Sequence, residues 1–509
     1  MSTAKRRVFL TAVISAVILI TVILTVTVVV PNVKEQQLAA LRVSAAEAYA
    51  AGDYSAAEER YRAILERVPD DCDAVITLAE CDRARGAWED AISLLESYPE
   101  SPEIAEALAE MPVPISNDGF FRALCTLFDT DVPTFGDLQS VTRISYRIRS
   151  YGMTPGSYTV ETAEAAVEEN CGKKLLTADL CSGLNYCRNA EIQIEINGVP
   201  VEEIELSGLP LLENVTSFTV KSTVFDDLDR IASLKSLTAL TLDNAGIDDI
   251  LPLAGLKDLK FLSLRDNAIS DLTPLALLPE LESLDLTSNE IERISVLSCL
   301  PRLKTLHLTN NEISDLSPLT ECGALEALYL DANAISDVSP LSGLTTLRTL
   351  NLSFNRITDL SPLQSCTGLS FLSVRSNAVT DTAPLSSLSS LTYLDISDNQ
   401  IADISCIADL KSLETLYASS NRIVDVSPLA EHPAIQTLHL YYNQITSVEA
   451  LGSAGQLTYL ILDGNSITDV SPLAALQKLE YLSVPENPIA DLSPVSHVKV
   501  VLDNAEDLW

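Results

Sequence analysis

A spacing of 22 residues recurs through the second half of the chain and limits the possible folds more than any other feature. Asparagine occurs at this interval at Asn267, Asn289, Asn311, Asn333, Asn355, Asn377, Asn399, Asn421, Asn443, Asn465 and Asn487. The stretch LRTLNLSFNRITDLSPL, residues 347–363, shows the unit, with leucine at positions 1, 4 and 6, asparagine at 9 and isoleucine at 11. Two weaker copies begin at Val215 and Leu237, so thirteen units extend from residue 215 to about residue 500.

This spacing is neither the period of a helix nor the alternation of a long strand. We expect each unit to form one coil of a right-handed solenoid, whose short strand stacks ~4.8 Å from the next in a parallel sheet. The apolar residues at positions 1, 4, 6, 11, 14, 17 and 20 would point inward and form one core, which a single unit cannot bury alone. The asparagine amide would satisfy buried backbone groups of adjacent coils.

The motif L-x-x-L-x-L-x-x-N-x-I resembles leucine-rich repeats of the 22-residue class found in internalin-like bacterial proteins, over residues 215–509. The resemblance implies a protein of the bacterial cell surface that binds other proteins on its concave face. Residues 111–214 precede the repeats as a linker and a cap; within them, 120–149 resembles the caps that begin many such domains, and EIQIEI (191–196) predicts a strand.

The end of each unit predicts a short helical turn on the convex side. Position 13 is aspartate in eleven of the thirteen units, Arg293 and Ser447 being the exceptions, and position 16 is proline in nine. Serine before proline suits a helix N-cap, and an aspartate just before the turn is favoured by the helix dipole. A ladder of calcium sites along this column is the alternative.

Residues 34–110 are rich in alanine and predict paired helices. Gly52-Asp53-Tyr54 and Gly86-Ala87-Trp88 lie 34 residues apart, and Ala45 and Ala79 match at the same offset. This segment resembles the tetratricopeptide repeat, whose period is 34 residues, with a further helix expected at 103–110. A peptide-binding groove and a stalk that aids dimerisation are both open interpretations.

Residues 8–30 are uncharged and are long enough to cross a bilayer of ~30 Å as one helix. Lys5, Arg6 and Arg7 precede them, so the positive-inside rule keeps residues 1–7 in the cytoplasm and exports the bulk of the chain. A cleaved signal peptide is the alternative. The predicted fold class is therefore an α/β solenoid of leucine-rich repeats with a parallel β-sheet on its concave face, preceded by an all-α tetratricopeptide-like segment and one transmembrane helix.

Composition and the lack of certain motifs disfavour several classes of function. Asp and Glu number 71 against 33 Lys and Arg, which disfavours nucleic acid as a partner. The sequence holds no HExxH, GxxxxGK[ST] or GxSxG motif, so we predict no enzyme, no metal and no cofactor. The ten cysteines include no CxxC pair and do not form a disulfide framework. Cys322 and Cys366 lie two coils apart, ~10 Å, beyond the reach of a disulfide.

The candidate site follows from residues that the core does not need. All seven tyrosines after residue 215 occupy positions 3, 5, 7 or 8, which face outward around the strand. Exposed aromatic clusters commonly anchor protein partners. The same columns carry twelve acidic and six basic residues, so we expect a partner with apolar area and positive charge. The predicted ligand-binding surface comprises Tyr329, Phe354, Phe371, Tyr393, Asp395, Tyr417, His439, Tyr441, Tyr442, Tyr459 and Tyr481.

Two other functions use different features. The same tyrosines could stack on sugars, which would make the chain a cell-wall or glycan-binding module. Alternatively, the helical repeats could recruit membrane partners, with the solenoid as a spacer in a structural assembly.

Overall fold

The computed structural model describes residues 33–85, 87–98, 101–110, 141–149, 157–162, 166–170, 191–197, 215–225 and 228–503. These residues fall into a helical unit near the N-terminus and a larger unit that contains the repeats. In the described ranges, no helix is both long and apolar enough to span a membrane. The expected transmembrane segment 8–30 and most of the linker and cap, 111–214, lie outside them.

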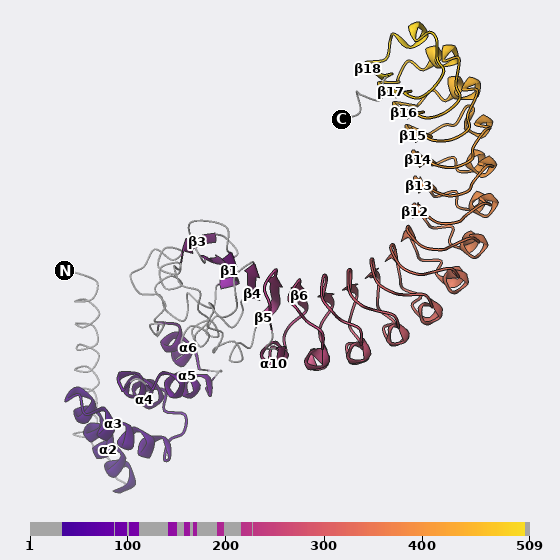
Figure 1. The fold of residues 1–509 in the computed structure, drawn as a ribbon. Coiled ribbons are helices and arrows are strands. Elements are labelled where there is room, and N and C mark those ends of the chain that lie inside the picture. Colours follow the sequence, from indigo (N-terminus) through magenta and orange to yellow (C-terminus); the bar gives the residue numbers. More distant parts are fainter. Residues whose placement is uncertain are drawn as a thin grey trace. The chain divides into compact units, whose positions relative to one another are not determined.

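The helical unit consists of α2 (Val33–Ala50), α3 (Tyr54–Leu65), α4 (Cys72–Ala84), α5 (Trp88–Glu96) and α6 (Pro102–Ala109) (Figure 1). Gly52 lies in the turn between α2 and α3. Its φ is 78°, a conformation that glycine adopts without strain. Asp53 and Asp71 cap α3 and α4 by accepting the backbone N–H groups of Ala56 and Ala74, both at 3.1 Å.

The 34-residue offset predicted from small residues is visible in the packing of this unit. Ala45 and Ala79 are 0% and 1% exposed, and Ala57 and Ala91 are both fully buried. Alanine at these sites lets neighbouring helices pack closely. The helix expected at 103–110 is α6, and its residue Ile104 is buried.

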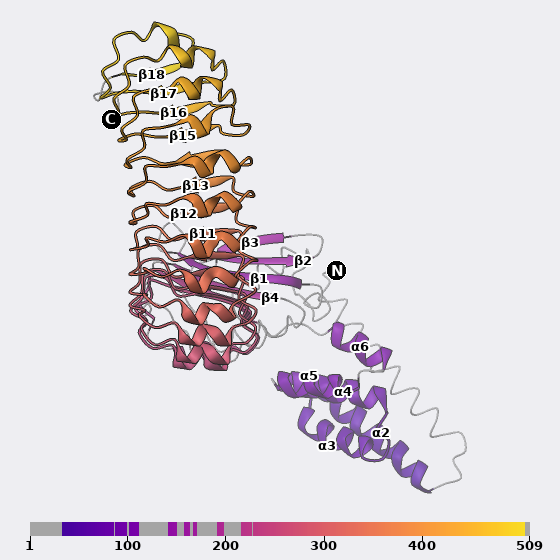
Figure 2. The same ribbon diagram turned by 90° about the vertical axis from the view of Figure 1, so that its right-hand side faces the viewer.

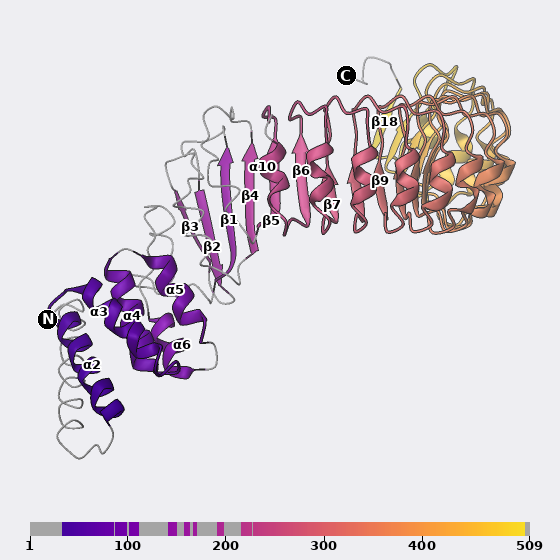
Figure 3. The same ribbon diagram turned by 90° about the horizontal axis from the view of Figure 1, so that it is seen from below.

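The larger unit is built on one run of parallel strands from residue 191 onward, whereas residues 158–171, with two of the described strands, group with the N-terminal helices. The described strands are β1 (Val141–Arg149), β2 (Ser157–Thr162), β3 (Ala166–Asn170), β4 (Glu191–Asn197), β5 (Val215–Lys221), β6 (Ala239–Asp243), β7 (Phe261–Ser263), β8 (Ser283–Asp285), β9 (Thr305–His307), β10 (Ala327–Tyr329), β11 (Thr349–Asn351), β12 (Phe371–Ser373), β13 (Tyr393–Asp395), β14 (Thr415–Tyr417), β15 (Thr437–His439), β16 (Tyr459–Ile461), β17 (Tyr481–Ser483) and β18 (Val500–Leu502). From β4 onward each strand pairs in parallel with the next, up to β18. Figure 3 shows β1 beside β4, which β5 and β6 follow. The fold is thus the predicted leucine-rich repeat solenoid.

The short helical turns lie on the outer side of the solenoid arc, and the strands line its inner side (Figure 1). Figure 2 shows their row from the convex side. They comprise the α-helix α10 (Leu228–Ala232) and the 3-10 helices η3 (Leu251–Gly255), η4 (Thr273–Leu277), η5 (Ser295–Cys299), η6 (Ser317–Glu321), η7 (Ser339–Gly343), η8 (Ser361–Ser365), η9 (Ala383–Ser387), η10 (Ser405–Asp409), η11 (Ser427–Leu429), η12 (Glu449–Ser453), η13 (Ser471–Ala475) and η14 (Ser493–Val495). The predicted convex turn is confirmed.

Its capping differs from the prediction. The serine at position 15 is the first residue of the 3-10 helix, and the residue before it makes no side-chain capping bond. The aspartate at position 13 caps instead: Asp315 Oδ1 accepts the N–H of Ser317 at 2.8 Å, and its Oδ2 accepts the Ser317 hydroxyl at 3.0 Å. The N-cap residue of this turn is the apolar Leu316, which has no side-chain acceptor, so the carboxylate two residues before Ser317 satisfies the free N–H. This contact accounts for the aspartate column without calcium.

The core is the predicted one. In the coil that begins at Leu347, all seven inward positions, including Cys366 at position 20, are at most 1% exposed. Asn355 donates from Nδ2 to Leu330 O of the previous coil at 2.9 Å and accepts the N–H of Ile335 at 2.9 Å. The other ten asparagines make the same pair of bonds, so the predicted structural role of this column is confirmed.

The cysteines in the described ranges are all free thiols. Cys322 and Cys366 donate to the carbonyls of Leu297 and Leu341 in the coils before them, at 3.3 and 3.5 Å. Burial raises the pKa of the Cys322 thiol to about 11. These thiols therefore pack as small apolar side chains.

Candidate functional site

Six of the predicted site residues form one continuous row of rings on the concave sheet, which we call the aromatic ladder. It consists of Phe371, Tyr393, Tyr417, His439, Tyr459 and Tyr481, on the successive strands β12 to β17. The parallel register places Phe371 opposite Tyr393, Tyr417 opposite His439 and Tyr459 opposite Tyr481. The row moves from position 3 to position 5 at Tyr417 and returns to position 3 at Tyr459, so two of its steps are diagonal.

Both ends of the aromatic ladder are stacked face to face. The ring centroids of Tyr459 and Tyr481 are 4.2 Å apart with planes 3° from parallel, and those of Phe371 and Tyr393 are 4.3 Å apart at 10°. Each of these rings therefore has one face covered by a neighbouring ring. The last ring lies beside Val500 in the register of β18. The ends of the ladder thus present ring edges and phenol hydroxyls, rather than open ring faces, to the concave side.

Tyr417 breaks this stack at the middle of the row. Its ring is tilted 56° from that of Tyr393, at 5.4 Å, and 79° from that of His439, at 4.3 Å. Tyr417 is thus the ring whose faces diverge from both of its neighbours. The aromatic ladder therefore has parallel stacked rings at both ends and, at Tyr417 between them, an irregular step where the rings are tilted.

The rings are half-buried, and their burial shifts their ionisation. Loss of water lowers the pKa of His439 to about 4. Burial, reinforced by the nearby Asp395 carboxylate, raises the pKa of Tyr393 to about 12. At neutral pH the ladder is therefore uncharged, and any charge that a ligand meets there comes from residues beside it.

Asp395 is the charged residue closest to the irregular step. It lies two residues after Tyr393 on β13 and opposite Tyr417 in the register of β14. Only 8% of the residue is exposed. Its Oδ1 accepts the N–H of Ser397 at 2.9 Å, yet burial still raises the pKa of its carboxyl above the usual value. Arg375, a positive charge that acts on this carboxylate, forms its ion pair with Asp398 instead.

A second feature, which the sequence patterns did not reveal to us, runs along position 8. Every described non-glycine residue at this position has a left-handed backbone, with φ between 48° and 58°. Five of the thirteen residues there are Asn, Asp or Gly, the types that tolerate this conformation, and four more are serine. That enrichment is the signal from which the left-handed column could have been predicted.

Phe354 and Tyr442 depart from this enrichment. They are bulky residues in the left-handed region, with φ of 55° and 52°, and remain 54% and 53% exposed. The left-handed backbone of a bulky residue costs conformational energy, and an exposed side chain does not offset this cost by burial. This combination is associated with functional sites. Arg375 lies over the Phe354 ring at 5.9 Å, and Tyr441 contacts Tyr442 edge to face at 5.6 Å.

Tyr329 is the remaining predicted site residue, and it lies apart from the aromatic ladder. It stacks on His307, with centroids 4.2 Å apart and planes 6° from parallel. Among the ring contacts that the structure describes, none links this pair, Phe354 or the Tyr441–Tyr442 pair to the ladder. The eleven predicted residues thus form one row of six rings with Asp395 beside it, and three smaller groups.

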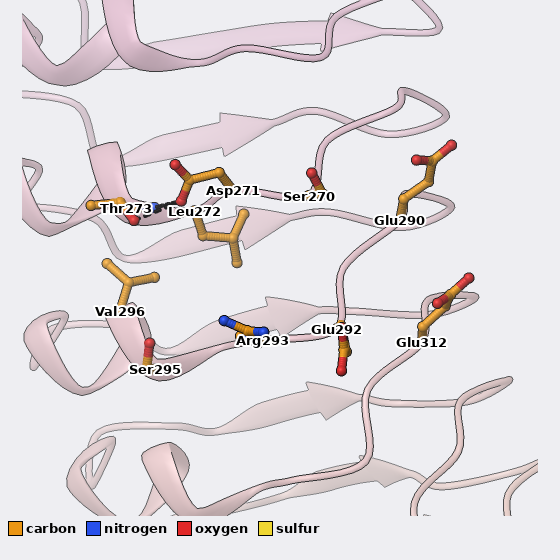
Figure 4. Close-up of a pocket in the computed structure, with 10 residues that line it drawn as sticks. All are labelled: Ser270, Asp271, Leu272, Thr273, Glu290, Glu292, Arg293, Ser295, Val296 and Glu312. Carbon is orange, nitrogen blue, oxygen red and sulfur yellow. Dashed lines mark hydrogen bonds between the residues drawn. The ribbon is translucent and has the colours of Figure 1, made fainter.

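Figure 4 shows a hollow of about 440 Å³ elsewhere on the solenoid, formed by the loops that follow the strands of three successive coils. Arg293 and Glu292 line it, and Asp271 caps its own turn there through Thr273. All its charged side chains are exposed. In the described part of the chain, no group of His, Cys, Asp and Glu has the arrangement of a metal site. The concave sheet therefore remains the stronger candidate.

Comparison with known proteins supports both repeat types. A family model described as "Leucine Rich repeats (2 copies)" matches residues 257–299, 279–321, 301–343, 324–365, 345–387, 389–431 and 411–453. A model described as "Tetratricopeptide repeat" matches residues 48–109. Both models describe repeats, and neither describes a catalytic domain. No curated protein matches the chain.

Solved structures with this solenoid include two from Listeria monocytogenes. An internalin from that organism is 28% identical, with a TM-score of 0.54, over 73% of this chain and 97% of its own. The functional domain of InlJ is 20% identical, with a TM-score of 0.51, over 66% and 73%. A leucine-rich repeat protein from Leptospira interrogans is 21% identical, with a TM-score of 0.58, over 64% and 92%. The last two likenesses concern the fold alone.

Proposed function

We propose that this chain is a membrane-anchored, extracytoplasmic binding protein that recognises a protein partner through the concave face of its solenoid. Residues 8–30 anchor it, with the N-terminus in the cytoplasm and the bulk of the chain outside. The partner is a peptide or a cell-surface protein. The likeness to an internalin supports a binding role.

The aromatic ladder is the observation that carries this proposal. Six rings in mutual contact on six neighbouring strands form a continuous amphipathic surface. The packing of the core leucines and the hydrogen bonds of the core asparagines do not require these rings. Tyrosine-rich surfaces supply rigid contact area and hydroxyl groups at low entropic cost, as binding interfaces do. Phe354 and Tyr442 extend the surface along position 8. Their rings are exposed and their backbone is left-handed.

The test combines Tyr417→Ala, Tyr441→Ala and Tyr442→Ala in the full chain. We expect the triple variant to fold, because none of these rings lies in the core, and to lose capture of the partner from native membranes. Phe261→Ala is the matched control, since Phe261 is a 41% exposed aromatic residue on β7, far along the sheet from the ladder. Equal capture by the triple variant and by wild type would refute the assignment of this face.

The glycan alternative needs open ring faces on which sugars can stack. At both ends of the aromatic ladder the faces are turned toward one another, so the most exposed rings are ones outside the ladder, such as Phe354 and Tyr442. A glycan array probed with the full chain separates the two functions. The scaffold alternative predicts instead that deletion of residues 34–110 alone abolishes activity.

Localisation has its own test. A reporter fused after Trp509 is expected outside the cytoplasm, because the positively charged flank of the anchor stays inside. A cytosolic reporter would remove the proposed setting, although not the binding surface.

A further inference from the structure

The part of the concave face that holds the aromatic ladder is acidic. In the six coils from Leu369 onward, the outward positions 2, 3, 5, 7 and 8 carry one basic residue, Arg375, and six acidic ones: Asp395, Asp398, Glu414, Asp463, Glu480 and Glu486. In the remaining seven coils these positions carry six acidic and five basic residues. Negative charge is therefore concentrated where the rings are.

Little of this charge is neutralised within the protein. Arg375 pairs with Asp398 at 2.8 Å, and Lys499 pairs with Glu480 at 2.5 Å. Among the described residues, no ion pair is found for Asp395, Glu414 or Glu486. A partner that covers this face would bury these carboxylates, which is costly unless it brings cations.

The irregular step of the ladder is the point where such a cation is best received. Asp395 is almost fully buried there, and the single arginine nearby is already bound to Asp398 and lies over Phe354. Tyr417 is tilted against Tyr393 and meets His439 edge to face, so it stands outside the parallel stack of rings. A cation is attracted to a carboxylate and to the face of an aromatic ring, but not to a ring edge, which is electropositive.

We propose that a lysine or arginine side chain of the partner protein binds beside the Tyr417 ring, with its cation at the Asp395 carboxylate. This inference rests on the proposed function and names the chemistry of its ligand. The stacked ends of the ladder contact the apolar and backbone parts of the same segment through ring edges and hydroxyls. Glu414 and Glu486 attract further basic residues on either side.

A random dodecapeptide library displayed on phage, selected on the purified full chain, tests the proposal with a defined probe. Wild type is expected to enrich peptides that share a lysine or arginine. Asp395→Asn keeps the shape of the side chain and removes its charge, and it should lose that enrichment. Asp409→Asn is the matched control, because Asp409 is exposed on η10 of the same coil, away from the sheet. It should select the same peptides as wild type.

A double-mutant cycle then measures the contact itself. The shared lysine or arginine of the best peptide is replaced by the neutral norleucine or citrulline. We expect this change to weaken binding to wild type by about tenfold or more, and to weaken binding to Asp395→Asn far less, because the two groups act as a pair. Equal losses with both proteins would overturn the proposal, as would selected peptides without a shared basic residue.

The triple variant at Tyr417, Tyr441 and Tyr442 distinguishes failure of the Asp395 contact from failure of the proposed function. If it selects no peptides while the cycle shows equal losses, the concave face binds its partner but Asp395 does not hold a cation. If it selects the same peptides as wild type, the concave face itself is wrongly assigned. A melting temperature for Asp395→Asn at or above that of wild type shows that lost selection does not reflect unfolding.

Discussion

The ring of Tyr442 lies on the backbone of Gly464, the residue at the same position of the next coil. A Cβ atom on residue 464 would overlap Cδ1 and Cε1 of that ring. Gly464 also has φ of 60°, and it is the only glycine in the left-handed position 8 column of the described coils. The absence of a side chain at 464 thus leaves room for the exposed Tyr442 ring against the backbone of the next coil.

Gly464→Ala is therefore expected to displace Tyr442 and weaken partner binding. The added methyl also costs about 1 kcal/mol of stability, because alanine is strained at this φ. Affinity for the selected peptides and urea unfolding report the two effects. Gly343→Ala is the matched control, since a Cβ there meets nothing within 4 Å. Unchanged affinity in Gly464→Ala would show that the position of the Tyr442 ring is irrelevant to binding.

Phe354→Asn should make the protein more stable and a poorer binder. Asparagine tolerates the left-handed backbone better than phenylalanine, and the exposed ring loses little packing when it is removed, so a gain of about 0.5–1 kcal/mol is expected. Urea unfolding measures the gain, and peptide affinity measures the loss. The reverse change, Asn310→Phe, should destabilise the protein by a similar amount. A loss of stability in Phe354→Asn would mean that the ring is structural.

Asn355→Ala should destabilise the solenoid by roughly 2–4 kcal/mol, because it leaves the N–H of Ile335 without its partner and removes one of the two bonds that the Leu330 carbonyl accepts. Asn351→Ala, in the same coil, removes only bonds to Ser353 and should cost less than about 1 kcal/mol. Chemical denaturation compares the two. Equal losses would contradict the bridging role of the position 9 amide.

The turn aspartates predict how stability responds to acid. Bonds from Ser317 lower the pKa of Asp315 below its usual 3.8, and those from Ser361 do the same for Asp359. Four more aspartates share this shift: Asp271, Asp425, Asp469 and Asp491. Because the folded-state pKa is depressed, each contribution is complete above 3.8 and is lost as pH falls from there through the lowered pKa.

We therefore expect the urea midpoint to fall steeply below about pH 4. Replacing Asp315, Asp359 and Asp425 together by asparagine should flatten this fall. Burial raises the pKa of Asp395 and Asp463, which has the opposite sign and adds stability as pH falls through their raised pKa toward the usual 3.8. An unchanged acid slope in the triple asparagine variant would contradict the capping role of these carboxylates.

The inward residues of the coils could be predicted from the sequence because every coil repeats the same requirement. Leu347, Asn355 and Cys366 each occupy a place that period and chemistry define, and the structure places them there. The prediction that Ser317 is an N-cap was wrong because a 3-10 turn and an α-helix share the same sequence signals. The two differ in which residue precedes the first free backbone N–H.

The arrangement of the candidate site could be predicted only in part. The period assigns Tyr393 and Tyr417 to outward positions of adjacent coils, but not the tilt between their rings, which depends on side-chain rotamers. The period does show that the coil between Tyr329 and Phe371 has no ring at positions 3 and 5, where Thr349 and Asn351 lie, so the separation of Tyr329 from the aromatic ladder could have been predicted. The left-handed backbone at Phe354 escaped prediction because the residue itself disfavours it.

Site-specific photo-crosslinking tests the central claim, that the concave aromatic face is where a partner binds, most directly. A photoreactive phenylalanine analogue is placed at Tyr441, on the concave side, or at Ser386, an equally half-buried residue of η9 on the convex side. The peptides selected by wild type are then added. We predict crosslinks from position 441 and none from position 386. Crosslinks from 386 alone would place the partner on the opposite side of the solenoid and contradict the account.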